Sequence, residues 1–370
     1  MNDQQPKIVL FVLAILALAA PAACGPPAYK AASVKHGSLK LHKQVWVMEL
    51  SGTATQRGAA AGQLVGDQVR WLLPRYLKKT LGKKKPSQQL IQAVKKLEPS
   101  IPEAHLEQLE ALAKTARVDR DTLLAVNLAP ELFAGLACSC LAVDKTKSND
   151  STVYLARNLD WHGGSLLTSL GLVVIETSRQ QRIASVTWPG LVGVVSGMND
   201  TGLSIANLVV FGQHRGVKPE TPILFAMRSV LESTQNVSAA VQKLSDTKRS
   251  VCQNFAIADS ETAVVLETCP GHVRLRKIKD GFVAVANRLN EDKNTRPESR
   301  FAKMRKAAML GKQDIDSLKS ILASVALGQL NVQAVIFTPK NLRLELATED
   351  TPAAEGPWHS LDLSPWLAKK

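Results

Sequence analysis

The fold is decided by the stretch Cys138-Ser139-Cys140-Leu141-Ala142-Val143, followed after a polar turn by Val153-Tyr154-Leu155-Ala156-Arg157-Asn158-Leu159-Asp160-Trp161. Two such runs around a turn predict a β-hairpin that carries a thiol, a guanidinium and a carboxylate. A nearby cation lowers the pKa of a cysteine from its reference value of about 8.5, so we expect Arg157 to favour the thiolate of Cys138. The pattern is also typical of inert core cysteines and of surface Arg/Asp pairs, which leaves both interpretations open.

Outside this hairpin the chain divides into a helical first third and a strand-rich remainder. The 370 residues include 45% hydrophobic ones, which is normal for a globular protein with a substantial core. A strand-like run at 44–50 precedes helical spacing at 55–73, 87–97, 101–116 and 119–128. Short β-rich runs then occur at 138–143, 152–158, 171–176, 182–187, 191–197, 203–210, 251–258, 263–268 and 281–286. Helical patterns interrupt them at 221–244, 296–310 and 314–327. This order predicts an α+β fold with antiparallel strands, because most strand connections are too short for crossovers.

The N-terminus has the features of an export signal. Residues 8–20 form an apolar run that is short for a membrane span and leads into Pro21-Ala22-Ala23-Cys24-Gly25. We therefore predict a signal peptide at 1–23 and a location in the periplasm or cell envelope. Ala-Ala-Cys is similar to the end of a bacterial lipoprotein signal, so membrane anchorage through Cys24 is left open. Residues 24–43, rich in Pro, Ala and Lys, are predicted as a linker.

Two further cysteines flank a second predicted hairpin, with its turn at 259–262. If that turn is symmetric, Cys252 lies opposite Cys269, and a cross-strand disulfide is geometrically possible. Two reduced, buried thiols on a sheet are the alternative.

The formal net charge is +14, and part of the excess is concentrated in residues 70–85. Such a run is typical of a solvated helix end, but it could also attract an anionic lipid or polymer. Nucleic acid is not expected as a partner of an exported protein. Cys138 and Cys140 lack the companion ligands of a zinc site, so no metal or cofactor is expected.

Three segments together carry a family resemblance. They are the Cys138 hairpin, the glycine-rich runs at 188–193 and 197–203, and the segment from Asn254 through Asn287 to Arg300. The combination resembles the cysteine N-terminal-nucleophile hydrolases, particularly the autoproteolytic acyltransferase group that includes penicillin acyl-CoA:6-aminopenicillanic acid acyltransferase. Acid ceramidase and bile-salt hydrolase are more distant relatives. The resemblance implies a four-layer αββα sandwich with two antiparallel sheets, preceded by a helical N-terminal segment.

In that group the chain cuts itself immediately before a cysteine, and the matching position is Cys138. The resemblance thus implies an N-terminal chain at 44–137 and a catalytic chain at 138–370. A freed α-amino group has a reference pKa of about 7.7 to 8.0, so it can take the thiol proton and no histidine is needed.

Four other site residues follow from the resemblance. It implies that Arg157 and Asp160 orient the new amine, that Asn287 stabilises the oxyanion, and that Arg300 is a distal active-site arginine. A fixed amide donor in a dry site can be worth about 3 kcal/mol of transition-state stabilisation.

Two details of this assignment are open. Residues 157 and 160 have opposite parity on a regular strand, so both reach Cys138 only if the strand ends or bulges near Asn158. A second oxyanion asparagine of bile-salt hydrolases falls near Val209 here, with Asn207 two residues early, and that role is not assigned.

The expected function is that of an exported, self-processed amidase or acyltransferase. Cys138 would accept the acyl group of a small-molecule amide or thioester, and water or an amine would then release it. The alternative is a non-catalytic, basic envelope lipoprotein that keeps the fold and binds an anionic polymer or membrane. The oligomeric state does not follow from the sequence.

Overall fold

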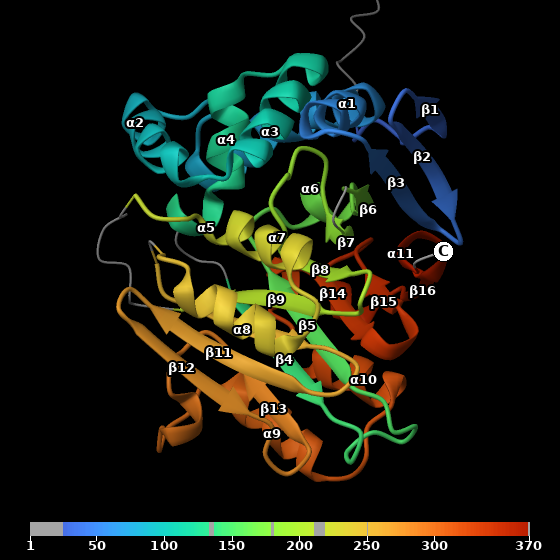
Figure 1. Cartoon of the computed structure of the whole chain (residues 1–370), viewed down its shortest axis with the longest axis vertical. Coiled ribbons are helices and arrows are strands. Elements are labelled where there is room, and N and C mark those ends of the chain that lie inside the picture. The colour runs from blue at the N-terminus through green and yellow to red at the C-terminus, as the bar shows by residue number, and fades with distance from the viewer. Residues whose placement is uncertain (1–24, 133–136, 179–180, 211–218, 250, 369–370) are drawn as a thin grey trace, which may run out of the picture.

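Two β-sheets packed face to face form the body of the protein (Figure 1). The computed structural model describes residues 25–132, 137–178, 181–210, 219–249 and 251–368. Every statement about the fold refers to these residues.

The larger sheet has ten strands in the order β1-β2-β3-β6-β7-β8-β9-β10-β11-β12. Its strands are β1 (Ala32–Val34), β2 (Gly37–His42), β3 (Val45–Ser51), β6 (Leu172–Thr177), β7 (Arg182–Thr187), β8 (Ser196–Asn199), β9 (Ser204–Val209), β10 (Gln253–Ala258), β11 (Ala263–Cys269) and β12 (His272–Lys277). All neighbours are antiparallel except β3 and β6, which pair in parallel. The prediction of antiparallel pairing is wrong for this pair, because the whole helical segment and the Cys138 hairpin provide a long crossover between them.

The smaller sheet has six strands in the order β13-β4-β5-β14-β15-β16, all antiparallel. These are β13 (Phe282–Val285), β4 (Ala137–Val143), β5 (Tyr154–Asp160), β14 (Asn331–Thr338), β15 (Arg343–Ala347) and β16 (His359–Asp362). The predicted hairpin is β4–β5, in which Cys138 pairs with Leu159 and Cys140 with Arg157.

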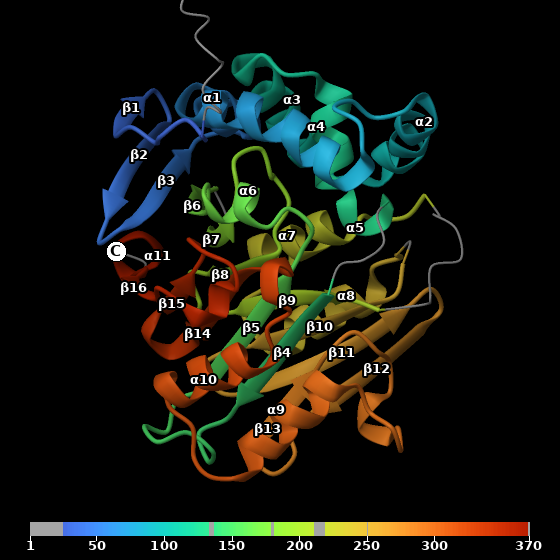
Figure 2. The same ribbon diagram turned by 180° about the vertical axis from the view of Figure 1, so that it is seen from behind.

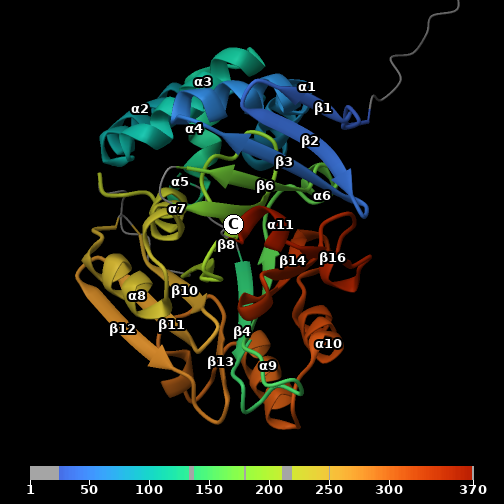
Figure 3. The same ribbon diagram turned by 45° about the vertical axis from the view of Figure 1, so that its right-hand side comes forward.

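Helices cover the outer face of each sheet (Figures 2 and 3). On the side of the larger sheet lie α1 (Ala54–Leu81), α2 (Gln88–Leu97), α3 (Glu103–Ala116), α4 (Arg120–Asn127), α5 (Ala129–Leu132), α7 (Ile223–Ser233) and α8 (Val237–Asp246). The short helix α6 (Ser165–Thr168) contacts α1 and β14 of the smaller sheet. On the smaller sheet lie α9 (Ser299–Met309) and α10 (Ile315–Val325), while α11 (Ser364–Leu367) is close to β7. Short 3-10 turns are η1 (Glu98–Ser100), η2 (Glu291–Lys293), η3 (Gly328–Leu330), η4 (Pro339–Asn341) and η5 (Ala353–Glu355).

The hydrophobic core follows this layering. The largest buried cluster lies between the sheets and continues under α7 and α8. A second joins the N-terminal helices to β2, β3 and β6, and a third joins α9 and α10 to the outer face of the smaller sheet. The predicted α+β fold with two stacked sheets and a helical N-terminal segment is confirmed.

The N-terminal helices begin where their capping residues are. The predicted starts at Ser87 and Asp119 are confirmed, because their side chains accept hydrogen bonds from the amides of Leu90 and Thr122 at 3.2 and 2.8 Å. Helix α1 packs closely on α3 through Gly58, where an added Cβ would lie 2.0 Å from the carbonyl oxygen of Gln108.

Residues 25–43 are not the predicted linker. The segment contains β1 and β2, and Leu39 of β2 is fully buried against the N-terminal helices. Leu39 alternates with Ser38 and Lys40, which lie on the other face, and this alternation is sufficient for a strand because β2 pairs with the edge of β3. The predicted signal peptide and Cys24 lie outside the described residues. Within them, no helix combines the length and the hydropathy that a bilayer crossing requires.

Cys252 and Cys269 form a disulfide, which is one of the two alternatives left open by the sequence. The register of β10 and β11 pairs Gln253 with Thr268, so the two cysteines lie opposite each other at the open end of this hairpin, with Cα atoms 4.0 Å apart.

Candidate active site

Cys138 lies on β4 with its side chain between the two sheets. Its Sγ accepts a hydrogen bond from Nη2 of Arg157 at 3.3 Å. Arg157 points to the same side because it is two residues before Leu159, the strand partner of Cys138. The predicted contact between thiol and guanidinium is therefore present.

The guanidinium of Arg157 is held by the larger sheet. Nη1 donates to the carbonyl oxygen of Val195 and to Oγ of Ser196, and Nη2 donates to the carbonyl oxygen of Asn207 at 3.3 Å. Oγ of Ser196 in turn donates to Oε1 of Gln333 on β14 at 2.5 Å. The Arg157 side chain is fully buried, so both sheets fix its position.

The backbone of Cys138 is held by two further predicted residues, Asn287 and Arg300. Its N–H donates to Oδ1 of Asn287 at 2.9 Å, and its carbonyl oxygen accepts from Nη1 of Arg300 at 3.0 Å. Arg300 also donates through Nη2 to Oδ1 of Asn287 at 2.8 Å. Nδ2 of Asn287 donates to the carbonyl oxygen of Val209 at 2.6 Å, so in the continuous chain this amide donor is already occupied.

Asp160 lies on the opposite face of the sheet and is connected to Cys138 through Arg300. Its Oδ2 lies 3.2 Å from Nη1 of Arg300, the same nitrogen that donates to the Cys138 carbonyl. Its Oδ1 accepts from Nδ2 of Asn331 at 2.9 Å and from the amide of Leu327 at 3.4 Å. Burial raises the pKa of Asp160, although Asn331 and Arg300 act in the other direction. The parity difficulty is thus resolved without a bulge in β5: Arg157 contacts the thiol, whereas Asp160 acts through Arg300.

The thiol of Cys138 is not activated in the continuous chain. The residue is 2% exposed, and burial raises the pKa of the thiol more than the positive charge of Arg157 lowers it. Arg157 lowers the pKa of the thiol, as expected, but burial has the larger effect. Cys140 lies in the same buried cluster, and burial raises its pKa well above the usual range.

A residue without an assigned role in the sequence analysis positions Asn287. Asn254 on β10 is fully buried, and its Nδ2 donates to the carbonyl oxygens of Ala286 and Arg288 at 3.0 and 2.9 Å. These two carbonyls lie on either side of Asn287. Asn254 stands in the third segment of the resemblance, which was the available signal. Asn331, Ser196 and Gln333 gave no signal, since their contacts are with residues distant in sequence.

Asn207 lies close to the site but is not aimed as an oxyanion donor. Its Nδ2 donates to Oε1 of Gln253 at 3.3 Å, while its Oδ1 has no hydrogen-bond partner among the described residues. Among the described residues, no three His, Cys, Asp or Glu side chains lie together so that they could hold a metal ion.

An apolar pocket lies between the N-terminal helices and the strand ends near the site. One wall is the inner face of α1 and another is Trp161, the residue after Asp160, whose Nε1 donates to the hydroxyl of Tyr76 at 2.6 Å. The lining consists of Val69, Leu72, Leu73, Tyr76, Leu123, Val126, Trp161, Leu167, Trp188, Pro189, Gly190 and Leu191. None of these side chains carries a charge, so the pocket suits a hydrocarbon or aromatic group.

Two stacked sheets, with a buried cysteine at the start of a central strand beside arginine, aspartate and asparagine, are typical of the cysteine N-terminal-nucleophile hydrolases. Residues 146–316 match the model of a family described as acyl-coenzyme A:6-aminopenicillanic acid acyl-transferase. The family resemblance predicted from the sequence is thereby confirmed. The matched region contains Arg157, Asp160, Asn287 and Arg300, and begins after Cys138.

Curated relatives are distant. An uncharacterized protein of Archaeoglobus fulgidus is 22% identical over 247 residues, covering 58% of this chain and 41% of the relative. Protein dcd1B of Dictyostelium discoideum is 22% identical over 264 residues, covering 63% of this chain and 52% of the relative. The chain thus spans about half the length of these curated relatives.

The chain is also similar to several solved structures. The Caenorhabditis elegans ortholog of N-acylethanolamine-hydrolyzing acid amidase has a TM-score of 0.46 and 19% identity, covering 55% of this chain and 93% of its own. Penicillin V acylase from Agrobacterium tumefaciens has a TM-score of 0.48 and 14% identity, covering 63% of this chain and 88% of its own.

Proposed function

We propose that this protein is a self-cleaving cysteine hydrolase or acyltransferase that acts on amides or thioesters of apolar acids. The observation that carries the proposal is that both the thiol and the backbone nitrogen of Cys138 are fixed by hydrogen bonds. Sγ of Cys138 lies 3.3 Å from Arg157, and the backbone nitrogen of Cys138 lies 2.9 Å from Asn287. A nucleophile and the nitrogen that would become its base are therefore fixed together.

In the proposed cleavage, Sγ of Cys138 attacks the carbonyl carbon of Ala137. The peptide C–N bond breaks, the Cys138 nitrogen leaves as an amine with the proton of the thiol, and a thioester forms. Water then splits the thioester into the Ala137 carboxylate and the free thiol. Asn287 and Arg300 hold the nitrogen and the carbonyl of Cys138, so we expect the residue to keep its place when the bond breaks.

The same groups then serve the substrate. The new α-amino group, with a reference pKa of about 7.7 to 8.0, takes the proton of the thiol, and Arg157 stabilises the thiolate. Attack on the acyl carbon forms a tetrahedral oxyanion, for which Nδ2 of Asn287 is the proposed donor in place of its contact with Val209. A donor of this kind contributes about 3 kcal/mol. The amine returns its proton to the leaving group, and water or an acceptor amine releases the acyl group from Cys138.

The apolar pocket supports an acyl part that is a hydrocarbon or aromatic chain, since its lining has no charged side chain. We also place the protein outside the cytoplasm, with membrane anchorage through Cys24 as the form of attachment. The disulfide between Cys252 and Cys269 supports export, because disulfides persist mainly in oxidising compartments.

Denaturing electrophoresis and mass measurement of the purified protein test the cleavage. We expect two fragments, one ending at Ala137 and one beginning at Cys138, and a single intact chain for Cys138→Ala. Cys140→Ala is the matched control, since it removes an equally buried thiol two residues away and should still be cut.

Activity is tested with N-acyl amino acids, β-lactam amides and bile-salt amides, again with Cys138→Ala as control. Turnover by Cys138→Ala would refute the assigned nucleophile. An intact, inactive chain that binds anionic surfaces would instead support the alternative of a non-catalytic binding protein.

A further inference from the structure

Helix α1 from residue 68, helix α2 and the loop between them carry charge of one sign. The sequence from 68 to 97 contains no Asp or Glu. Its basic residues are all exposed, and together they define the basic face: Arg70, Arg75, Lys78, Lys79, Lys83, Lys84, Lys85, Lys95 and Lys96. Arg70 pairs with Asp67 and Lys95 with Asp121, but within the described chain no ion pair neutralises the others. Most of this charge is therefore available to an external anion.

The basic face and the apolar pocket lie on opposite sides of α1. The opposite side of α1 supplies Leu72 and Tyr76 to the pocket wall, so cations and pocket lining share one helix. Lys79 at the border donates to the carbonyl oxygen of Gly163, which precedes α6. In Figure 2, α1 crosses the outer surface of the molecule above α6.

The first described residues of the chain also contact α1. Nε2 of Gln68 on α1 donates to the carbonyl oxygens of Pro27 and Ala28 at 3.2 and 3.1 Å. The apolar run at 8–20 is a short distance upstream in sequence. Any attachment of the N-terminus to a membrane would therefore act on the same end of the protein as the basic face.

We propose that the basic face docks the protein onto a membrane that contains anionic lipid. Clustered lysines next to a lipid surface are attracted by its negative potential. The half-buried Trp71, with the Arg75 guanidinium 4.6 Å from its ring centroid, is of the kind found where a protein meets a membrane interface. Nucleic acid is disfavoured, because Trp71 and the buried Tyr76 are the only aromatic residues of 68–97 and cannot form a platform for stacked bases.

In this orientation α1 lies between the membrane surface and the apolar pocket, because Leu72 and Tyr76 line the pocket from the opposite side of the helix. The proposal concerns binding only and holds whether or not Cys138 is catalytic.

Sedimentation with lipid vesicles tests the proposal on the full chain. We expect tighter binding to vesicles of equal parts phosphatidylcholine and phosphatidylglycerol than to phosphatidylcholine alone, and a smaller difference between the two at high salt. The triple variant Lys83→Gln, Lys84→Gln, Lys85→Gln should bind on the order of 100-fold more weakly, at about fivefold for each lysine.

A matched control removes the same charge elsewhere. Lys303→Gln, Lys306→Gln, Lys312→Gln changes three exposed lysines on and after α9 and should bind as the unchanged chain does. Cys138→Ala should also bind normally, which separates this test from that of the proposed catalysis. Equal loss in both triple variants, absence of vesicle binding, or competition by DNA at lower concentration than by vesicles would overturn the proposal.

Discussion

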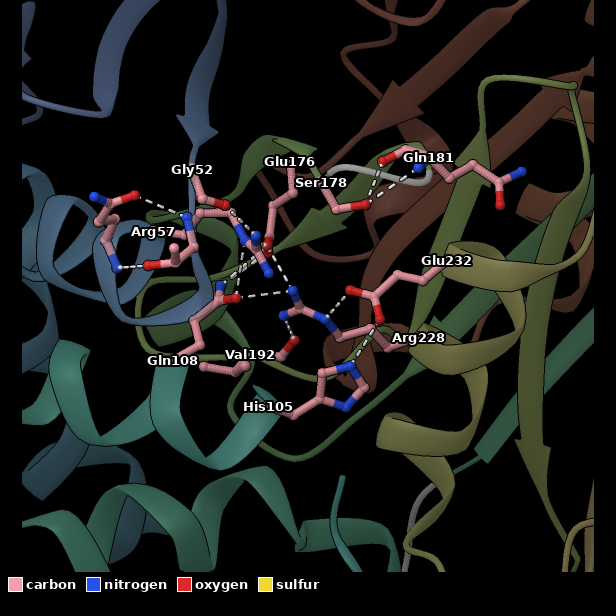
Figure 4. Close-up of polar contacts among 12 residues, drawn as sticks. Gly52, Arg57, His105, Gln108, Glu176, Ser178, Gln181, Val192, Arg228 and Glu232 are labelled. Atoms are coloured by element: carbon pink, nitrogen blue, oxygen red, sulfur yellow. Dashed lines mark hydrogen bonds and ion pairs between the residues drawn. The ribbon is translucent and has the colours of Figure 1, made fainter. Parts of the chain in front are cut away.

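Neutralising Glu176 on β6 should destabilise the protein strongly, because this carboxylate joins two buried arginines. Its Oε2 lies 2.9 Å from Nε of Arg57 on α1 and 2.5 Å from Nη2 of Arg228 on α7. Gln108 on α3 donates to both carboxylate oxygens at 3.1 Å. Figure 4 shows the arrangement, in which residues of the N-terminal helices α1 and α3 meet residues of β6 and α7 around one carboxylate.

The size of the effect follows from what each arginine keeps in Glu176→Gln. Arg228 retains Glu232, whose Oε1 is 2.8 Å from its Nε. Arg57 has no other carboxylate within ion-pair distance in the described chain and keeps only the neutral oxygens of Gly52 and Gln108. One buried charge is left without a counterion, and breaking a buried pair in this way costs about 3 to 5 kcal/mol. We expect the lower value, since the new amide can still accept one hydrogen bond.

Urea unfolding followed by circular dichroism measures this change in the free energy of unfolding. Glu261→Gln is the control, because it breaks the exposed pair with Lys145 and should leave stability unchanged. The double variant Arg57→Met, Glu176→Gln should recover part of the loss, since it removes the uncompensated charge. If Glu176→Gln is no less stable than Glu261→Gln, the reasoning about this network is wrong.

Three other outcomes are expected. Asn254→Asp loses both hydrogen bonds to the carbonyls beside Asn287. It should displace Asn287, slow self-cleavage at least tenfold and lower the free energy of unfolding by about 2 kcal/mol. Normal cleavage would show that Asn254 does not position the site. Burial raises the pKa of Glu131 from its ordinary 4.5 to about 8, so between these pH values the folded state binds a proton that the unfolded state does not, and stability falls as pH rises. Glu131→Gln should lose less stability over that range. An identical pH profile of the variant and the unchanged protein would contradict this. Replacing Cys252 and Cys269 by Ala should cost about 3 kcal/mol of unfolding free energy, as expected for a loop of this length, and reduction of the unchanged chain should have the same effect.

Local features of the fold could be predicted from the sequence. The β4–β5 hairpin follows from two apolar runs around a polar turn, and α2 and α4 begin at the capping residues Ser87 and Asp119. The β10–β11 register follows from the symmetry of its turn. In each case the residues that determine the structure are close together in the chain.

Features that depend on distant partners could not be predicted. The sequence of β2 is typical of a linker, because Lys40 and Leu41 are exposed and Leu39 is its one buried residue. Leu39 is buried by α1 and β3, which no local pattern indicates. The predicted strands do not include β12, most of whose residues are exposed. They also do not include β14, β15 and β16. The strand expected at 191–197 begins only at Ser196, since the glycine-rich segment before it lines the apolar pocket and packs under α7.

The candidate site shows the same division. The resemblance selected Cys138, Arg157, Asp160, Asn287 and Arg300, and the structure brings all five together. It did not show that Asp160 acts from the far side of the sheet through Arg300, because that depends on α9 covering the outer face. Nor did it show that burial outweighs Arg157 at the thiol, since the extent of burial is set by the larger sheet.

The parallel pairing of β3 with β6 constrains the order of events in the life of the chain. β3 lies before Cys138 and β6 after it, so a cut at the proposed bond would turn neighbours in one sheet into strands of separate polypeptides. Assembly as one molecule must then come first, while the covalent link still limits how far the two strands can diffuse apart. Fragments made separately would have to find this register by bimolecular collision, and we expect them to recover the folded protein far more slowly than the uncut chain does.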